Sequence, residues 1–244
     1  MRRAGVLVTS MVTVLAMGTV LAHAAPATDT DDHYSLANTQ LYGVAAVKPA
    51  QCPTTAAPTV FVTCFSVPGN APTLTVYCKS STASGMTPAA TAPLGYFPLN
   101  HLPTFGLCTD SLGGTETNLV QQGTNGHKWQ IKEVDKANDE TGTVEPNATG
   151  DSLNVLVPQA GVIVTTSQGC KITVSPSGDS VVGGSYNDAG VYHTVTTTLH
   201  VIVQKLKTSC PPAAGVSITT TFHAIYTFHS GSPTGPVAKL YDKG

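Results

Sequence analysis

The strongest constraint on the fold is a strict two-residue alternation near the C-terminus. In residues 191–204, the odd positions are apolar except for His193 and Thr197, while the even positions are mostly threonine and other polar residues. Residues 217–229 alternate in the same way, with one face formed by Phe222, Ala224, Tyr226 and Phe228. Successive side chains of a β-strand point to opposite faces, so both segments are predicted to be half-buried strands.

The rest of the chain indicates the same class. Short runs rich in valine and threonine alternate with turns that contain glycine or proline, and no segment has sustained helical spacing. Prolines recur throughout 41–107, which favours short strands there because proline donates no ladder hydrogen bond, and 80–93 is expected to be a loop. We predict an all-β domain built as a single antiparallel β-sandwich, with barrel-like closure as the second possibility.

The N-terminus has the pattern of a secretory signal. Arg2 and Arg3 precede an apolar stretch, and Ala22-His23-Ala24 has small residues at the positions that signal peptidase recognises. We expect export by the general secretory route, with a membrane anchor as the alternative. The predicted organisation is a cleaved signal (1–24), a flexible polar leader (25–40), a β domain with a proline-rich N-terminal part (41–229) and a loose tail (230–244).

All six cysteines follow the predicted cleavage site. An even number of cysteines in an exported chain predicts disulfides, and none lies in a C-x-x-C pair that would indicate zinc or a redox site. Fifteen connectivities are possible. We predict sequential pairing: Cys52 with Cys64, Cys78 with Cys108, and Cys170 with Cys210.

The charge of the chain excludes one class of partner. Of its twelve basic residues, Arg2 and Arg3 lie in the signal, which leaves ten lysines against fourteen acidic residues. Binding to nucleic acid needs clustered positive charge, so it is not expected. No basic amphipathic segment indicates membrane-surface binding, and no stable membrane insertion is expected after signal cleavage. No cofactor is predicted.

The histidines form one candidate metal site. If 191–204 and 217–229 pair with their turn near Cys210, His200 and His223 come within a residue or two of each other on the polar face, where a third ligand such as His229 could complete a site. Two exposed histidines on a threonine-rich sheet is the alternative. His193, on the apolar face, is expected to be a core residue.

Two further features are candidates for ligand binding. Acidic residues in 133–145 suggest calcium, although their spacing departs from the EF-hand and also fits a solvated loop. Trp129 and Tyr96 could stack on sugars, while core packing is the alternative for Trp129. Neither G-x-S-x-G nor H-E-x-x-H is present.

Several motifs resemble a known group of proteins. They are Val157-Pro-Gln-Ala-Gly through Cys170, Ile172-Thr-Val-Ser-Pro, Gly183-Gly-Ser-Tyr-Asn187, Cys210-Pro and Thr221-Phe-His-Ala-Ile-Tyr-Thr-Phe228, with Cys108-Thr-Asp-Ser-Leu-Gly-Gly114 and Asn125-Gly-His-Lys-Trp129 upstream. Over about 73–228 the chain resembles exported, largely uncharacterised actinobacterial β-sandwich proteins rich in threonine and glycine. The resemblance implies a secreted sandwich with cysteines paired near strand ends, and no catalytic residues.

These observations favour a non-enzymatic structural or interaction protein that is secreted or associated with the cell surface, with an unknown partner. A module that binds extracellular glycans or small ligands is the first alternative. A secreted enzyme that depends on calcium or another metal is the second.

Overall fold

A computed structural model of the chain describes residues 33–34, 36–68, 73–89, 96–134, 152–187, 190–194, 197–210, 217–238 and 242–243. The predicted signal, 1–24, lies outside these residues. No helix that is long and apolar enough to cross a membrane occurs in the described part of the chain.

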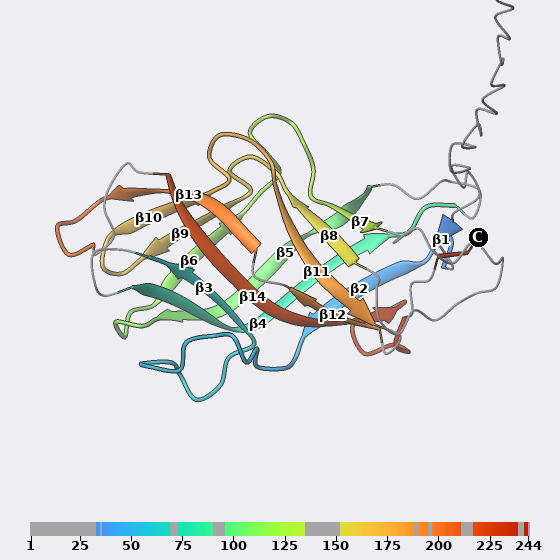
Figure 1. The fold of residues 1–244 in the computed structure, drawn as a ribbon, viewed down its shortest axis with the longest axis horizontal. Helices are drawn as coiled ribbons and strands as arrows, with labels where there is room; N and C mark the ends of the chain where they lie inside the picture. The colour runs from blue at the N-terminus through green and yellow to red at the C-terminus, as the bar shows by residue number, and fades with distance from the viewer. Residues whose placement is uncertain are drawn as a thin grey trace, which may run out of the picture.

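The described residues form fifteen strands and no helix (Figure 1). The strands are β1 (His33–Tyr34), β2 (Gln40–Ala45), β3 (Thr63–Val67), β4 (Leu74–Met86), β5 (Phe97–Asp110), β6 (Glu116–Val120), β7 (Gln130–Val134), β8 (Ser152–Val157), β9 (Val162–Thr166), β10 (Cys170–Val174), β11 (Ser180–Asn187), β12 (Val191–Thr194), β13 (Thr197–Lys205), β14 (Ser217–Ser230) and β15 (Asp242–Lys243).

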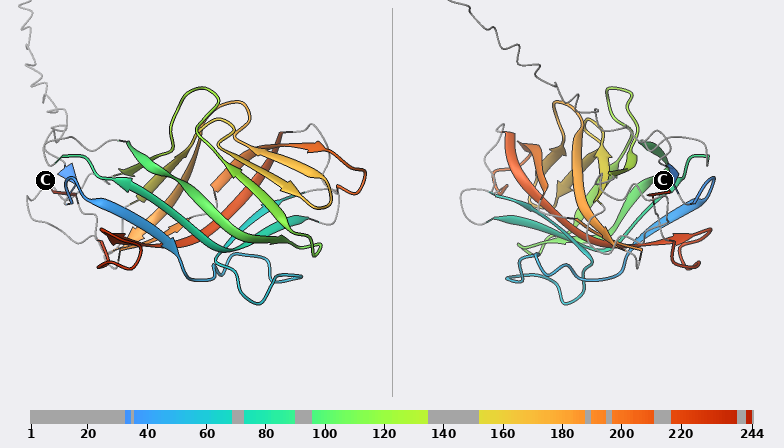
Figure 2. Two further views of the ribbon diagram at one scale, coloured as in Figure 1. Left: turned by 180° about the vertical axis from the view of Figure 1, so that it is seen from behind. Right: turned by 45° about the vertical axis from the view of Figure 1, so that its right-hand side comes forward.

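The main sheet closes on itself through β14. Following the pairings from β14 through β2, β4, β5, β7, β8, β11 and β12 leads back to β14, so eight antiparallel strands form a closed barrel. Figure 2 shows these strands running obliquely around a common axis. The predicted all-β, disulfide-stapled fold is confirmed. Its sheet closes into a barrel, which the sequence analysis gave as the second possibility after a β-sandwich.

A second group of strands extends the barrel lengthwise. The first half of β14 pairs with β3 and β13, and the sheet continues from β13 through β10 and β9 to β6. A bridge between Thr109 and Thr115 links β5 to the start of β6. Because β4, β5 and β14 serve both groups, one continuous interior runs along the molecule.

The segment 191–204 departs from the predicted single strand. Its two parts, β12 and β13, both pair with β14, but their registers differ by one residue. Such a shift exchanges the two faces of a strand. Leu199 in β13 is therefore buried as predicted, whereas in β12 the buried side chains are Tyr192 and Thr194. The expectation that His193 is a core residue is wrong, because it lies on the less buried face.

Strand β4 continues through Met86, so the prediction of a loop over 80–93 is wrong for its first half. Ser81 is fully buried and shares a hydrogen bond of 2.7 Å with the Tyr226 hydroxyl, which satisfies its hydroxyl group inside the sheet. Strand β5 contains Pro98 and Pro103 although it lies between β4 and β7. The β4–β5 register is irregular opposite 99–104, and such bulges accommodate residues without a ladder donor.

Residues of the predicted leader and tail that the structure describes contact the barrel. The backbone and the side chain of Thr39 are both hydrogen-bonded, the former to Thr87 Oγ1 at 2.9 Å. In the tail, Ala238 is 2% exposed and donates its N–H to Phe228 O at 2.8 Å. Strands β1 and β15 also pair with each other.

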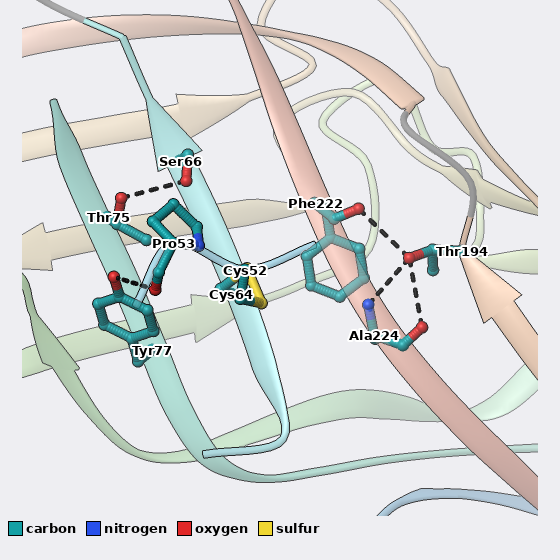
Figure 3. Close-up of a disulfide and its surroundings, with 9 residues drawn as sticks. All are labelled: Cys52, Pro53, Cys64, Ser66, Thr75, Tyr77, Thr194, Phe222 and Ala224. Carbon is teal, nitrogen blue, oxygen red and sulfur yellow. Dashed lines mark hydrogen bonds between the residues drawn. A yellow bond between two sulfur atoms is a disulfide. The ribbon is translucent and has the colours of Figure 1, made fainter. Parts of the chain in front are cut away.

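All three disulfides join the cysteines that the sequence predicted to pair. The bond between Cys52 and Cys64 fastens the loop 46–62 to the outer face of β3, as Figure 3 shows. There it buries a small second core with Phe61 and Tyr77, and the Tyr77 hydroxyl donates to Pro53 O at 3.0 Å. The loop therefore covers an outer sheet surface that would otherwise face water.

Replacing Cys52 and Cys64 together by serine should lower the free energy of unfolding by about 2–4 kcal/mol, because a loop of this length loses its covalent closure. Urea unfolding monitored by circular dichroism measures this change. An unaltered midpoint would show that packing alone holds the loop.

Candidate functional site

The main candidate site is an apolar cavity inside the barrel, with a volume of about 110 Å³. Its wall comes from strands of both groups, so it lies in the continuous interior. The lining side chains include Phe65, Val76, Leu99, Phe105, Asn118, Trp129, Ile131, Val155, Val157, Val162, Val164, Val174, Val182, Tyr192, Thr194, Leu199, Phe222, Tyr226 and Phe228.

The few polar groups on the wall are engaged with the protein itself. The Tyr192 hydroxyl donates to Val182 O at 3.0 Å. Thr194 Oγ1 lies within 3.3 Å of the carbonyl oxygens of Phe222 and Ala224 and accepts from the Ala224 N–H at 2.9 Å, as Figure 3 shows. Because these groups have partners, the wall offers few hydrogen bonds to water or to a polar ligand.

The cavity follows from the choice of residues on two pairs of strands, β8 with β11 in the barrel and β9 with β10 in the second group. On β8, β9, β10 and β11 the lining positions are valines: Val155, Val157, Val162, Val164, Val174 and Val182. The interior of an eight-stranded barrel is just wide enough for side chains to fill. Valines in place of larger side chains leave part of it unfilled. This run of inward valines is the signal in the sequence that indicates a cavity, once these four strands are known to face one interior.

Trp129 is one wall of the cavity. Its side chain is 4% exposed, and its indole Nε1 donates to Gln121 O at 2.8 Å. The core-packing alternative therefore describes this residue, and its ring is not on the surface where a sugar could stack. Tyr96 lies apart from the cavity wall: it is 41% exposed, with Lys132 Nζ 5.8 Å from its ring centroid.

The structure does not bring His200 and His223 together. Strands β13 and β14 pair as predicted, but the register places Thr219 opposite His200. His223 is four residues further along β14, about 13 Å away at the rise of a strand. The turn lies near Cys210 as expected, since the pairing is centred between Ser209 and Cys210. The prediction that the two histidines nearly face each other is wrong because this centre places His200 opposite Thr219, four residues from His223.

The two histidines also differ in environment. His200 is exposed, whereas His223 is 6% exposed and lies beside Cys64 on the outer face that loop 46–62 covers. Its Nδ1 has no hydrogen-bond partner, and burial lowers the pKa of the imidazole. No group of three or more histidine, cysteine or acidic side chains suited to a metal occurs in the described residues. Most of the acidic run 133–145 lies outside them.

A surface pair of side chains was not predicted from the sequence. His127 Nδ1 lies 2.5 Å from Asp179 Oδ2, and Asn125 Nδ2 donates to Asp179 Oδ1 at 2.8 Å. These hydrogen bonds lower the pKa of Asp179 despite the opposing effect of burial. The His127 side chain is 62% exposed, and the contact joins two turns on the outside of the barrel.

Comparison with protein-family models, curated proteins and solved structures found no match in any of the three.

The burial of His223 predicts a pH dependence of stability. Its pKa is lower in the folded state than the value of about 6.5 expected in the unfolded chain, so the unfolded state binds more protons below that value. Stability should fall as the pH drops below about 6.5, and His223→Gln should weaken this dependence. Urea unfolding between pH 5 and pH 8 measures it, with exposed His200→Gln as the control. Equal pH dependence in wild type and His223→Gln would contradict the assignment.

Proposed function

We propose that this protein is a secreted, non-enzymatic binding protein that takes up a small apolar molecule in the interior of its barrel. The proposal rests on the cavity of about 110 Å³, whose wall is almost entirely aliphatic and aromatic. Binding sites for small molecules are concave and mostly apolar, and eight-stranded barrels can hold one small ligand in this way.

The cavity volume limits the size of the ligand. An engineered apolar cavity of about 150 Å³ stays dry and binds benzene. The cavity here is somewhat smaller. It therefore suits a single ring or a short branched hydrocarbon, and a larger ligand would require side chains on the wall to move.

The chemistry of the wall favours a ring. Aromatic side chains from several strands surround the cavity: Phe65, Phe105, Trp129, Tyr192, Phe222, Tyr226 and Phe228. Edge-to-face contacts between aromatic groups add about 0.5–1.5 kcal/mol beyond burial of area. A small aromatic compound would gain from these contacts, while a compound with several hydroxyl groups would lose its hydrogen bonds to water without replacement.

Export of the protein is part of the proposal. Three disulfides indicate folding in an oxidising environment. Together with the signal-like segment that ends at Ala24, they support secretion. The glycan alternative has less support, because Trp129 is buried in the barrel.

Trp129 provides a direct test of the proposal. It is the only tryptophan in the chain and lines the cavity, so its fluorescence reports what enters. Iodobenzene, an apolar heavy-atom quencher, should quench this fluorescence with a saturable dependence on concentration. Iodide ion, which stays in water, should quench it much less.

Two neighbouring valines provide a matched pair of variants. Val182 lines the cavity and is 5% exposed, whereas Val181 is 40% exposed. Val182→Phe should fill part of the cavity and weaken iodobenzene quenching at least several-fold. Val181→Phe adds the same atoms on the less buried side and should leave quenching unchanged. Equal quenching in both variants, or none in the wild type, would contradict the proposal.

If Val182→Phe does not fold, a third variant still tests the proposal. Leu199→Ala enlarges the cavity and should lower the free energy of unfolding by about 2–5 kcal/mol. Part of this loss should return in the presence of benzene, because a ligand that binds only the folded state stabilises it. Thermal melts with and without benzene measure the recovery, and an unchanged melting temperature would oppose a ligand cavity.

A further inference from the structure

Two carboxyl groups meet at the end of the barrel where β5 turns into β6. Asp110, the last residue of β5, is 3% exposed. Glu116 is on the face of β6 that it shares with the cavity residue Asn118. The carboxyl group of Glu116 faces that of Asp110 within hydrogen-bonding reach. The pair lies outside the cavity wall, so its role is separate from the proposed function.

One oxygen of Asp110 has a structural role. Its Oδ1 accepts hydrogen bonds from the backbone N–H groups of Leu112 at 2.8 Å and Gly114 at 2.9 Å, which hold the β5–β6 turn. Gln168, in the β9–β10 turn, donates its amide Nε2 to the same oxygen at 3.5 Å. These contacts bring two turns from different parts of the chain together around one carboxylate.

The remaining oxygens of the cluster have no donor. Asp110 Oδ2, both carboxyl oxygens of Glu116 and Gln168 Oε1 are buried without a hydrogen-bond partner. Within the described residues, neither carboxylate forms an ion pair, and the nearby Lys207 Nζ donates instead to Ser167 O at 3.4 Å. Buried polar atoms nearly always have a partner, so these four oxygens need a proton, an ordered water or a cation among them.

Gly114 makes room for this arrangement. A Cβ atom at this position would lie 2.7 Å from Asp110 Oδ2 and 2.4 Å from Gln168 Nε2. Any side chain there would displace the carboxylate or the amide, so the bare backbone lets both groups converge.

We propose that Asp110, Glu116 and Gln168 form a binding site for a divalent cation, with calcium as the ion that fits their chemistry best. Calcium binds carboxylate and amide oxygens and accepts water as its remaining ligands. A proton shared by the two carboxyl groups would give partners to two oxygens and leave the others without one. A cation with its waters can serve all of them, and it would tie the β5–β6 turn to the β9–β10 turn.

Isothermal titration of the full oxidised protein with calcium chloride, after treatment with EDTA, tests this site. We expect one calcium per chain, with a dissociation constant of about 10⁻⁴–10⁻³ M as in other extracellular calcium sites. Magnesium should bind more weakly because it needs a stricter geometry. Calcium should also raise the melting temperature of the wild-type protein.

Glu116→Gln keeps the shape of the side chain but removes its charge, and it should weaken calcium binding at least tenfold. Asp179→Asn removes a carboxylate elsewhere on the barrel and should bind calcium like the wild type. Absence of both heat and a thermal shift with the wild-type protein would overturn the proposal and leave a shared proton between the carboxyl groups. Calcium binding that survives Glu116→Gln unchanged would also overturn it, by placing the ion elsewhere.

Discussion

The architecture depends on the pairing of β14 with four other strands. Its second half pairs with β2 and β12, which closes the eight-stranded barrel, and its first half pairs with β3 and β13, which extends the sheet at the other end. No other strand in the described residues belongs to so many pairings. The alternation of Phe222, Ala224, Tyr226 and Phe228 is what keeps this strand in place, because each of these side chains faces the interior. Slipping the strand by one residue would turn them outward.

Because β14 closes the sheet into a barrel, the inward side chains of the strands determine how much of the interior is filled. A closed sheet must fill its interior with the side chains that its strands supply, and here β8 and β11 in the barrel, with β9 and β10 beside it, supply valine. The result is a cavity rather than a fully packed core, with Trp129 on its wall and few polar groups open to a ligand. On the outer surface, the disulfide between Cys52 and Cys64 holds loop 46–62 over a second, smaller core. The outer surface around β3 is thus covered, whereas the interior keeps an unfilled cavity.

Much of the fold could be predicted from local patterns. Period-two alternation predicted strands over 191–204 and 217–229, where β12, β13 and β14 lie, and the sequential cysteine pairing chosen from fifteen possibilities is the one observed. Features that depend on register could not be obtained in this way. A shift of one residue between β12 and β13 exchanged the roles of Tyr192 and His193, and the centre of the hairpin separated His200 from His223. The cavity and the Asp110–Glu116 pair require knowledge of which strands are neighbours, and local sequence does not contain it.

A closed barrel lined by valines and aromatic rings should enclose a dry apolar cavity that can take a guest. Crystals of the oxidised protein under xenon pressure would show whether it does, because xenon enters apolar cavities and scatters strongly. We expect xenon density inside the barrel, bounded by Trp129, Val182 and Leu199. An interior without xenon, whether filled by side chains or by ordered water, would contradict this expectation.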